Sequence, residues 1–284
     1  MMKTLELNDL LTNKLNRLSK RAGELSYLGI NPNDVADRPM VAVVGTRKPT
    51  PYGKDLTERI VSELVREGVV IVSGLAFGID IIAHQTTLRE NSTTIAILPS
   101  GLNNIYPATH RNIAHDILAD GALISEFAPD HQPRAAEFLA RNRIIAALAD
   151  AVFIPEAAER SGSLNTAGHA HKMGIPVFAA PGRSIDLMSS GTNHLIRTGK
   201  ATMATTANDI LKTLNIKSPA VKPAPQGNDT HETSVLIAIQ SGIQDTTLLQ
   251  KELEMDIIKL QSVLTILEIN GQVEQNEIGQ WGLV

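Results

Sequence analysis

The chain has 284 residues, of which 43% are hydrophobic, 20% are charged and 3% are aromatic, and its formal net charge is −4. This apolar fraction is ordinary for a globular protein and excludes a chain that is disordered throughout. Without cysteine the chain has no disulfides, thiolate metal sites or cysteine nucleophiles. With the polar N-terminus and no long apolar run, this composition favours a cytoplasmic protein that does not cross a membrane.

The first 40 residues are expected to form a short N-terminal helical segment, 1–40. Leucines at mixed helical spacings predict an amphipathic helix over 5–28. The sequence Asn31-Pro32-Asn33-Asp34 then breaks the pattern.

From residue 41 to 216 short apolar runs alternate with helical stretches. The runs predict buried strands at 41–45, 69–73, 93–98, 122–125, 151–155 and 176–180. The stretches between them predict helices at 53–67, 79–90, 109–119, 137–148 and 163–173. Strands that are apolar throughout and separated by helices predict an α/β fold with a mostly parallel sheet covered on both faces. Ligands of such sheets bind at the carboxyl ends of the strands.

The C-terminal part divides into a linker and a small domain. Residues 217–231 contain three prolines and predict a semi-stiff linker. Residues 232–284 predict a winged-helix domain, with helices near 232–240, 246–253 and 256–270 before two short strands. This domain carries a net charge of −6, whereas 41–216 is neutral. Because like charges repel, we predict that it contacts protein rather than DNA.

Polar, glycine-rich loops follow most of the predicted strands. They lie at 45–49, 73–80, 99–102, 156–166 and 181–183. Glycines let the backbone turn tightly and present N–H groups to an anion, and a helix that begins just beyond adds its positive end. Several such loops at one sheet edge favour a polyanion site over simple strand-to-helix turns.

Arginines are unusually placed in the helix predicted at 137–148. Arg141, Asn142 and Arg143 directly precede the apolar run 144–148. We expect Arg141 and Arg143 to converge with Arg47 and Lys48 at the carboxyl ends of the strands.

Catalytic motifs are not matched. The chain lacks Gly-x-Gly-x-x-Gly after the first strand and a Gly-x-Ser-x-Gly elbow, and the spacing from Gly45 to Gly53 is too long for a P-loop. His84 follows Asp80 by four residues, and we interpret them as a hydrogen-bonded pair that fixes the loop. We expect no catalytic residue, no metal and no cofactor.

Several segments together resemble the bacterial DNA-processing protein A family (DprA, also called Smf). The segments are 41–47, 73–80 with His84, Tyr106-Pro107, Ser125-Glu126, 138–143, 161–167 and Pro181-Gly182. The resemblance covers about 41–210 and extends weakly to 232–284. It implies a Rossmann-like, doubly wound core, 41–216, with a C-terminal winged helix.

The resemblance also implies a function. Members bind single-stranded DNA as homodimers and help to load the RecA recombinase onto incoming strands covered by single-strand-binding protein, during natural transformation. They are not enzymes. Carried over to this sequence, the DNA-binding positions are Gly45, Thr46, Arg47, Lys48, Ser73, Gly74, Phe138, Arg141, Asn142, Arg143, Ser161 and Gly162.

Two features depart from the family pattern. Phe77 stands where the family usually has a basic residue, so one phosphate contact is missing, and we expect this ring to pack rather than to stack on a base. Members also usually have a longer helical domain before the core, which puts the partner contacts made through that domain in doubt.

Two other functions remain as alternatives. A nucleotide-processing enzyme similar to the LOG-like phosphoribohydrolases would need a Pro-Gly-Gly-x-Gly-Thr-x-x-Glu signature. The matching stretch, 161–169, lacks both the glycine run and the glutamate. A transcription regulator would need a basic recognition helix, but only Lys251 and Lys259 are positive in 232–284.

Overall fold

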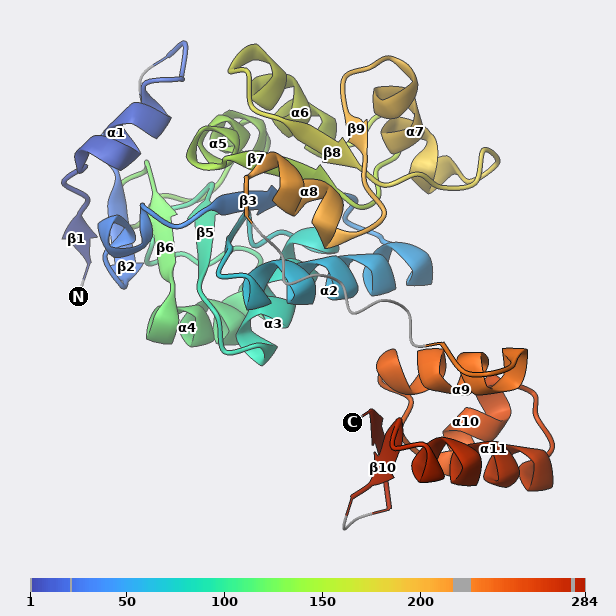
Figure 1. Cartoon of the computed structure of the whole chain (residues 1–284). Helices are drawn as coiled ribbons and strands as arrows, with labels where there is room; N and C mark the ends of the chain where they lie inside the picture. Colours follow the sequence, from blue (N-terminus) through green and yellow to red (C-terminus); the bar gives the residue numbers. More distant parts are fainter. Residues whose placement is uncertain (1, 21, 217–225, 277–278, 284) are drawn as a thin grey trace. The chain divides into compact units, whose positions relative to one another are not determined.

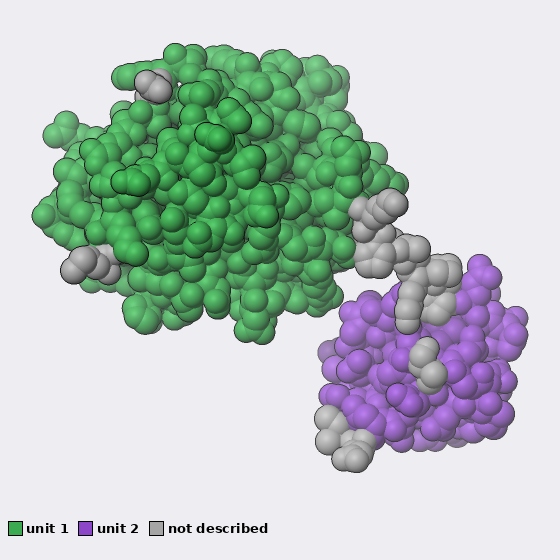
Figure 2. Space-filling model, turned by 60° about the vertical axis from the view of Figure 1, so that its left-hand side comes forward, with its two compact units in different colours: residues 1–216 green, residues 217–284 purple. Residues whose placement is uncertain are grey.

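The computed structural model describes residues 2–20, 22–216, 226–276 and 279–283. The chain forms two compact units, unit 1 (1–216) and unit 2 (217–284), shown in green and purple in Figure 2. Among the helices of these described ranges, none combines the length and apolarity needed to cross a membrane.

Unit 1 is built on one nine-stranded sheet (Figure 1). The strand order is β1-β2-β6-β5-β4-β3-β7-β8-β9. Strands β3 to β9 pair in parallel, and β1 and β2 add two antiparallel strands beside β6. The strands are β1 Lys3–Thr4, β2 Ser26–Gly29, β3 Met40–Val43, β4 Val70–Ser73, β5 Thr94–Leu98, β6 Ala122–Ser125, β7 Ala151–Ile154, β8 Val177–Ala179 and β9 Thr202–Met203.

Helices cover both faces of this sheet. Helices α1, α5, α6 and α7 pack on one face, and α2, α3, α4 and α8 pack on the other. The helices are α1 Asp9–Leu15, α2 Pro51–Arg66, α3 Ile79–Arg89, α4 Arg111–Asp120, α5 Ala135–Leu148, α6 Ser163–Lys172, α7 Ser190–Arg197 and α8 Ala207–Thr213. The predicted α/β, Rossmann-like, doubly wound sheet is therefore confirmed.

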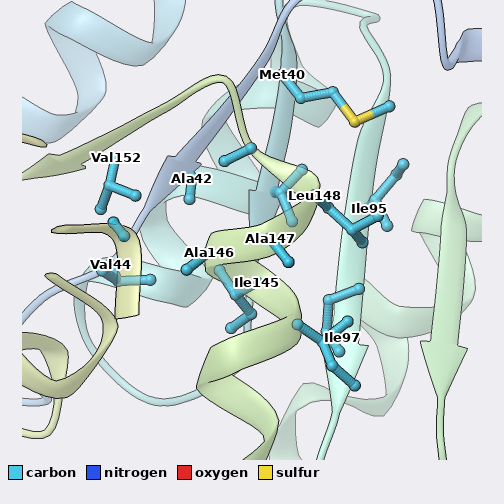
Figure 3. Close-up of a cluster of buried hydrophobic side chains, with 14 of the residues drawn as sticks. Met40, Ala42, Val44, Ile95, Ile97, Ile145, Ala146, Ala147, Leu148 and Val152 are labelled. Atoms are coloured by element: carbon cyan, nitrogen blue, oxygen red, sulfur yellow. The ribbon is translucent and has the colours of Figure 1, made fainter. Parts of the chain in front are cut away.

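The central strands are buried on both sides, which explains their continuous apolar runs. Every residue of β3 and β4 is buried. On one face, Ile145 and Leu148 of α5 belong to one buried cluster with Met40 and Ile95, and Figure 3 labels all four. A strand with no solvent face tolerates a polar side chain only where that side chain is hydrogen-bonded, as Ser73 at the end of β4 is to the carbonyl of Val43.

The prediction of one helix over 5–28 is wrong. Only Asp9–Leu15 is helical, and Ser26–Gly29 forms β2, which pairs with β6. Leu11 and Leu25 are both buried in the same core, so a leucine-rich stretch satisfies either structure. Pairing also covers the edge of β6, which would otherwise expose unpaired backbone groups. The segment 1–40 thus contributes β1 and β2 to the sheet of unit 1 and is not a separate helical segment.

Unit 2 consists of three helices and a β-hairpin, and it confirms the predicted winged helix. Its elements are α9 Thr230–Gln240, α10 Thr246–Glu252, α11 Ile257–Ile269, β10 Val273–Gln275 and β11 Trp281–Leu283. They enclose a core of their own that includes Leu236, Leu264 and Trp281. Of the predicted linker 217–231, residues 217–225 lie outside the described residues, and α9 begins within its last two positions.

Candidate functional site

The strand order of unit 1 reverses between β3 and β7. From β3 the chain proceeds outward through β4, β5 and β6, and it then returns to place β7 on the other side of β3. In open α/β sheets, a crevice forms beyond the carboxyl ends of the strands at such a reversal. A cavity of about 840 Å³ lies there, and the loops after β3 and β7 line it.

Buried Glu156 joins these two loops. Its carboxylate accepts hydrogen bonds from the N–H of Thr50 at 2.8 Å and from the Thr50 hydroxyl at 2.7 Å. Its carbonyl oxygen accepts the N–H of Thr46 at 2.8 Å. Gly45 lies so close to these groups that a Cβ atom there would come 2.8 Å from the Glu156 carbonyl oxygen. Glu156 therefore fixes the loops after β3 and β7 relative to each other, and glycine is required at position 45 where the two loops meet.

The N-terminus of α6 faces the cavity. Ser161, Gly162, Ser163 and Thr166 all line it. The Thr166 hydroxyl is buried, and no hydrogen-bond partner for it exists within the described ranges. The positive end of the helix dipole and this unused hydroxyl both favour an anionic ligand.

Cations and aromatic rings also line the cavity. The guanidinium carbon of Arg47 lies 5.1 Å from the centre of the Phe138 ring. The Phe138 ring in turn meets Tyr106 edge to face, with 5.5 Å between ring centroids. Lys48 and Arg160 also line the cavity, and both side chains are exposed. The lining therefore offers positive charge together with a half-buried aromatic ring.

Arg141 is the buried cation of the lining. Its Nη1 donates to the carbonyl oxygens of Gly74, at 2.7 Å, and of Ile97. Burial lowers the pKa of Arg141 to about 10, against the opposing effect of the Asp80 charge, so the guanidinium remains charged at neutral pH. Burial raises the pKa of Asp80, opposed by the Arg141 charge and by the N–H groups of Ala76 and Gly74. Arg141 thus ties the ends of β4 and β5 together and adds positive charge beside the cavity.

Most of the predicted DNA-binding residues come together in this lining. Those that line the cavity are Gly45, Thr46, Arg47, Lys48, Phe138, Arg141, Asn142, Ser161 and Gly162. The other three have structural contacts elsewhere. Ser73 is buried and donates to the carbonyl of Val43 at 2.6 Å, and Gly74 packs against Arg141.

Arg143 does not join the expected convergence. Its Nη2 donates to the Glu126 carboxylate at 2.6 Å, and the residue is not part of the cavity lining. The reason is helical geometry, because residues two apart on a helix do not share a face. Arg141 points toward the cavity, so Arg143 cannot.

The expected hydrogen bond between Asp80 and His84 is also wrong. Asp80 accepts the N–H of Gly74 at 3.1 Å, whereas His84 Nδ1 bonds the Thr94 hydroxyl at 2.7 Å. Both side chains are buried, and burial together with the Arg141 charge lowers the pKa of His84 to about 3. Asp80 therefore fixes the backbone just after β4, and His84 is bound to a side chain at the start of β5.

The sequence alone did not single out several lining residues. Arg160 directly precedes Ser161, so its position in the same loop was a usable signal. Tyr106 belongs to a segment that resembles the family, but the sequence alone does not indicate that its ring lines the cavity. Met188 lines the cavity from the helical turn Leu187–Ser189, and no motif marks it. Phe77 is 45% exposed and packs edge-on against His110.

Comparison with known proteins gives a consistent result. The family model described as DNA recombination-mediator protein A matches residues 8–215. The chain is 42% identical over 178 residues to DNA processing protein DprA of Streptococcus pneumoniae, a match that covers 63% of this chain and 62% of that protein. It is also 42% identical over 189 residues to Protein Smf of Escherichia coli, covering 66% of this chain and 50% of that protein. The matched part thus spans between half and two thirds of these relatives.

Two solved structures are also similar. One describes the single-stranded DNA binding mode of DNA processing protein A from Helicobacter pylori, with a TM-score of 0.68 and 36% identity, and it covers 75% of this chain and 95% of that chain. The other is DprA from Streptococcus pneumoniae, with a TM-score of 0.69 and 38% identity, and it covers 75% of this chain and 73% of that one.

Proposed function

The chain belongs to the DNA recombination-mediator protein A family, and from this premise we propose that its cavity binds single-stranded DNA. The observation that supports this most directly is the position of Arg47 over the Phe138 ring at the cavity. A guanidinium can hold a phosphate while the aromatic ring beside it stacks on a base.

The remaining lining suits a strand that is bound without regard to sequence. Lys48, Arg141 and Arg160 add positive charge, and the α6 N-terminus faces the same space. Among the described residues, Asp80 is the one acidic residue that lines the cavity, and its carboxylate already accepts the N–H of Gly74. Phosphate contacts of this kind position a strand but read no bases.

The wider role that we propose is that of a recombination mediator. The protein protects incoming single strands and helps to load RecA onto them, with single-strand-binding protein as a further partner. A homodimer would place two cavities on one strand, so that avidity strengthens modest contacts. The family description and the cavity of unit 1 support this role.

We propose that the protein acts by binding and not by catalysis. In the stretch that aligns with the phosphoribohydrolase signature, His169 stands in place of the catalytic glutamate. His169 lies outside the cavity lining, and burial lowers its pKa. N-glycosidic hydrolysis would therefore lack its acid–base group at this position.

The test is fluorescence anisotropy with a labelled oligo-dT strand and a matched duplex across a salt series. Wild type should prefer the single strand. Arg47→Ala should weaken binding about tenfold and flatten the salt slope by about 0.7, the value for one phosphate contact on a single strand. Arg66→Ala is the matched control, because Arg66 is an exposed cation of the same unit that pairs with Glu90 away from the cavity.

Two results would contradict the proposal. Equal losses for Arg47→Ala and Arg66→Ala would indicate binding to general surface charge. Absence of single-strand binding at low salt would remove the function itself, and hydrolysis of nucleotides would then be assayed.

A further inference from the structure

Unit 2 exposes large apolar side chains along α11. Ile258 is 73% exposed, Ile269 is 79% exposed and Ile266 is 46% exposed. The opposite side of α11 is filled by buried Leu260 and Leu264, which belong to the core of unit 2. The core therefore does not need the exposed isoleucines, and their exposure has no structural purpose within unit 2.

Ile258 and Ile269 stand at the two ends of one straight ridge of exposed residues. Positions 258, 262, 265 and 269 are separated by four, three and four residues, a spacing that keeps side chains on one face of a helix. At 1.5 Å per residue the ridge is about 16 Å long. Isoleucine stands at both ends, with Ser262 and Thr265 between them. We call these four residues the α11 ridge.

The position of the ridge in the fold is the one that usually meets DNA. In helix-turn-helix proteins, the helix in this place enters the major groove and approaches it with cations. Here none of the four ridge residues is charged, and unit 2 carries a net charge of −6 over 232–284. An uncharged ridge on an acidic unit is unsuited to a phosphate backbone.

Acidic residues lie at both ends of the α11 ridge. Glu254 and Asp256 directly precede α11, and Glu268 is adjacent to Ile269. Lys259, the cation of α11, follows Ile258 and contacts His231 Nε2 at 2.6 Å. A second copy of unit 2 would bring the same negative charges together and would be repelled. A partner with positive charges at both ends of an apolar stripe would be attracted and would cover the isoleucines.

We propose that the α11 ridge is a docking surface for an amphipathic helix of another protein, one that presents an apolar stripe flanked by lysine or arginine. Helices of this type recognise such surfaces through anchors at positions i, i+4 and i+7. The partner would bury Ile258 and Ile269, while its cations would meet Glu254, Asp256 and Glu268. This inference is independent of the DNA-binding function proposed for unit 1.

The test uses the full chain and a displayed library of synthetic helices. Each library member has a fixed leucine stripe at i, i+4, i+7 and i+11, and its flanking positions are randomised. Selection should enrich lysine and arginine at the flanks. A labelled selected peptide should bind the full chain in anisotropy measurements, and binding should weaken as salt screens the acidic ends.

Three variants identify the surface. Ile258→Ser with Ile269→Ser should weaken peptide binding at least about tenfold, because the peptide would lose both apolar side chains that it buries at the two ends of the ridge. Glu254→Gln with Glu268→Gln should reduce the salt dependence. The matched control is Leu187→Ser in unit 1, because Leu187 is also 79% exposed and should leave binding unchanged. Fluorescence of Trp281 verifies in each case that unit 2 is folded.

Several outcomes would overturn the proposal. These are a selection without enrichment of basic flanks, a selected peptide whose binding survives the double serine variant, and an equal loss in Leu187→Ser. Self-association of the chain that the serine variant removes would make a second copy the occupant. Duplex DNA binding removed by the same variant would make the ridge a DNA interface.

Discussion

Units 1 and 2 differ in how charge relates to surface. Residues 1–216 carry a net charge of only +1, yet Arg47, Lys48, Arg141 and Arg160 all line one cavity. Residues 232–284 carry −6, and the exposed ridge of α11 carries no charge at all. In unit 1 the fold concentrates scattered cations at a strand reversal, so net charge is a poor guide to the ligand. In unit 2 net charge and local surface agree, and both disfavour nucleic acid.

The two units also carry separate spectroscopic reporters. The single tryptophan of the chain, Trp281, is in unit 2, where its Nε1 donates to the Thr246 hydroxyl at 3.1 Å. All three tyrosines, Tyr27, Tyr52 and Tyr106, are in unit 1. Denaturation followed by tryptophan and by tyrosine fluorescence therefore follows unit 2 and unit 1 separately, as a chain with two units requires.

The largest effect is expected from Arg141→Met. The change leaves the buried carbonyls of Gly74 and Ile97 without their donor and removes the charge that balances Asp80. Breaking a buried charged network of this kind costs about 3–5 kcal/mol. In a denaturant titration, the tyrosine transition of unit 1 should move by this amount, while the Trp281 transition stays in place.

The matched control for this prediction is Arg47→Met. Arg47 is exposed and contacts the Phe138 ring, so its loss should cost less than about 1 kcal/mol of stability. A shift of the Trp281 transition in Arg141→Met would show that the two units unfold together, and the comparison between them would fail.

The sequence predicts the sheet of unit 1 well because its strands are buried on both faces. In β3 and β4 every position is apolar or, like Ser73, satisfied by a backbone group, and the helical stretches between strands fix the crossover connections. The N-terminal error has a physical cause. The leucines over 5–28 reach the same core from either a helix or a strand, and only the pairing of β2 with β6 decides between them.

The candidate site was predictable only in part. Glycine-rich loops after strands indicated the sheet edge, but the sequence does not show which arginine of α5 faces it. Arg141 and Arg143 are the same residue type in the same helix, and they differ only in the face of α5 on which each side chain lies. Met188 enters the lining through a helical turn far along the chain, and such tertiary proximity leaves no local pattern.

The next effect concerns pH. The pKa of His84 is lowered to about 3 by burial and by the Arg141 charge, from an ordinary value of 6.5. Between these values the unfolded chain binds a proton that the folded chain excludes, so the stability of unit 1 should fall as the pH drops below 6.5, by at most about 1.4 kcal/mol per pH unit. In unit 2 the N–H groups of Glu232 and His231 lower the pKa of Asp229. The contribution of ionised Asp229 to the stability of unit 2 is therefore lost only at pH values below the ordinary range of aspartate.

His84→Gln isolates this contribution. Glutamine does not titrate and keeps an amide that can bond Thr94. Asp80 acts in the opposite sense because burial raises its pKa, but it is present in both proteins and cancels in the difference. Tyrosine-detected denaturation at pH 6.5 and at about pH 5 should show a steeper loss for wild type than for the variant. Equal slopes would mean that His84 accepts its proton without penalty in the folded state.

The smallest effect is expected from Arg143→Ala, and it bears most directly on where the binding surface ends. Arg143 pairs with Glu126, whose Oε1 also accepts the N–H of Gly23 at 2.5 Å. Since Glu126 keeps this donor, the loss of the arginine should cost only about 1 kcal/mol of unit 1 stability. Single-strand affinity should change by less than about twofold, against about tenfold for Arg47→Ala.

The comparison of Arg47→Ala with Arg143→Ala distinguishes DNA binding in the cavity from DNA binding by general positive charge of unit 1. Both are single cations on the same unit, but only Arg47 lines the cavity. If Arg143→Ala weakened binding as strongly as Arg47→Ala, the bound strand would have to reach the Glu126 side of α5. Glu126→Gln shows whether such a loss of affinity comes from the missing cation or from the broken ion pair, because it removes the charge of the Arg143 partner and keeps the cation. Unchanged affinity in Glu126→Gln together with unchanged affinity in Arg143→Ala would confine the DNA to the reversal point between β3 and β7.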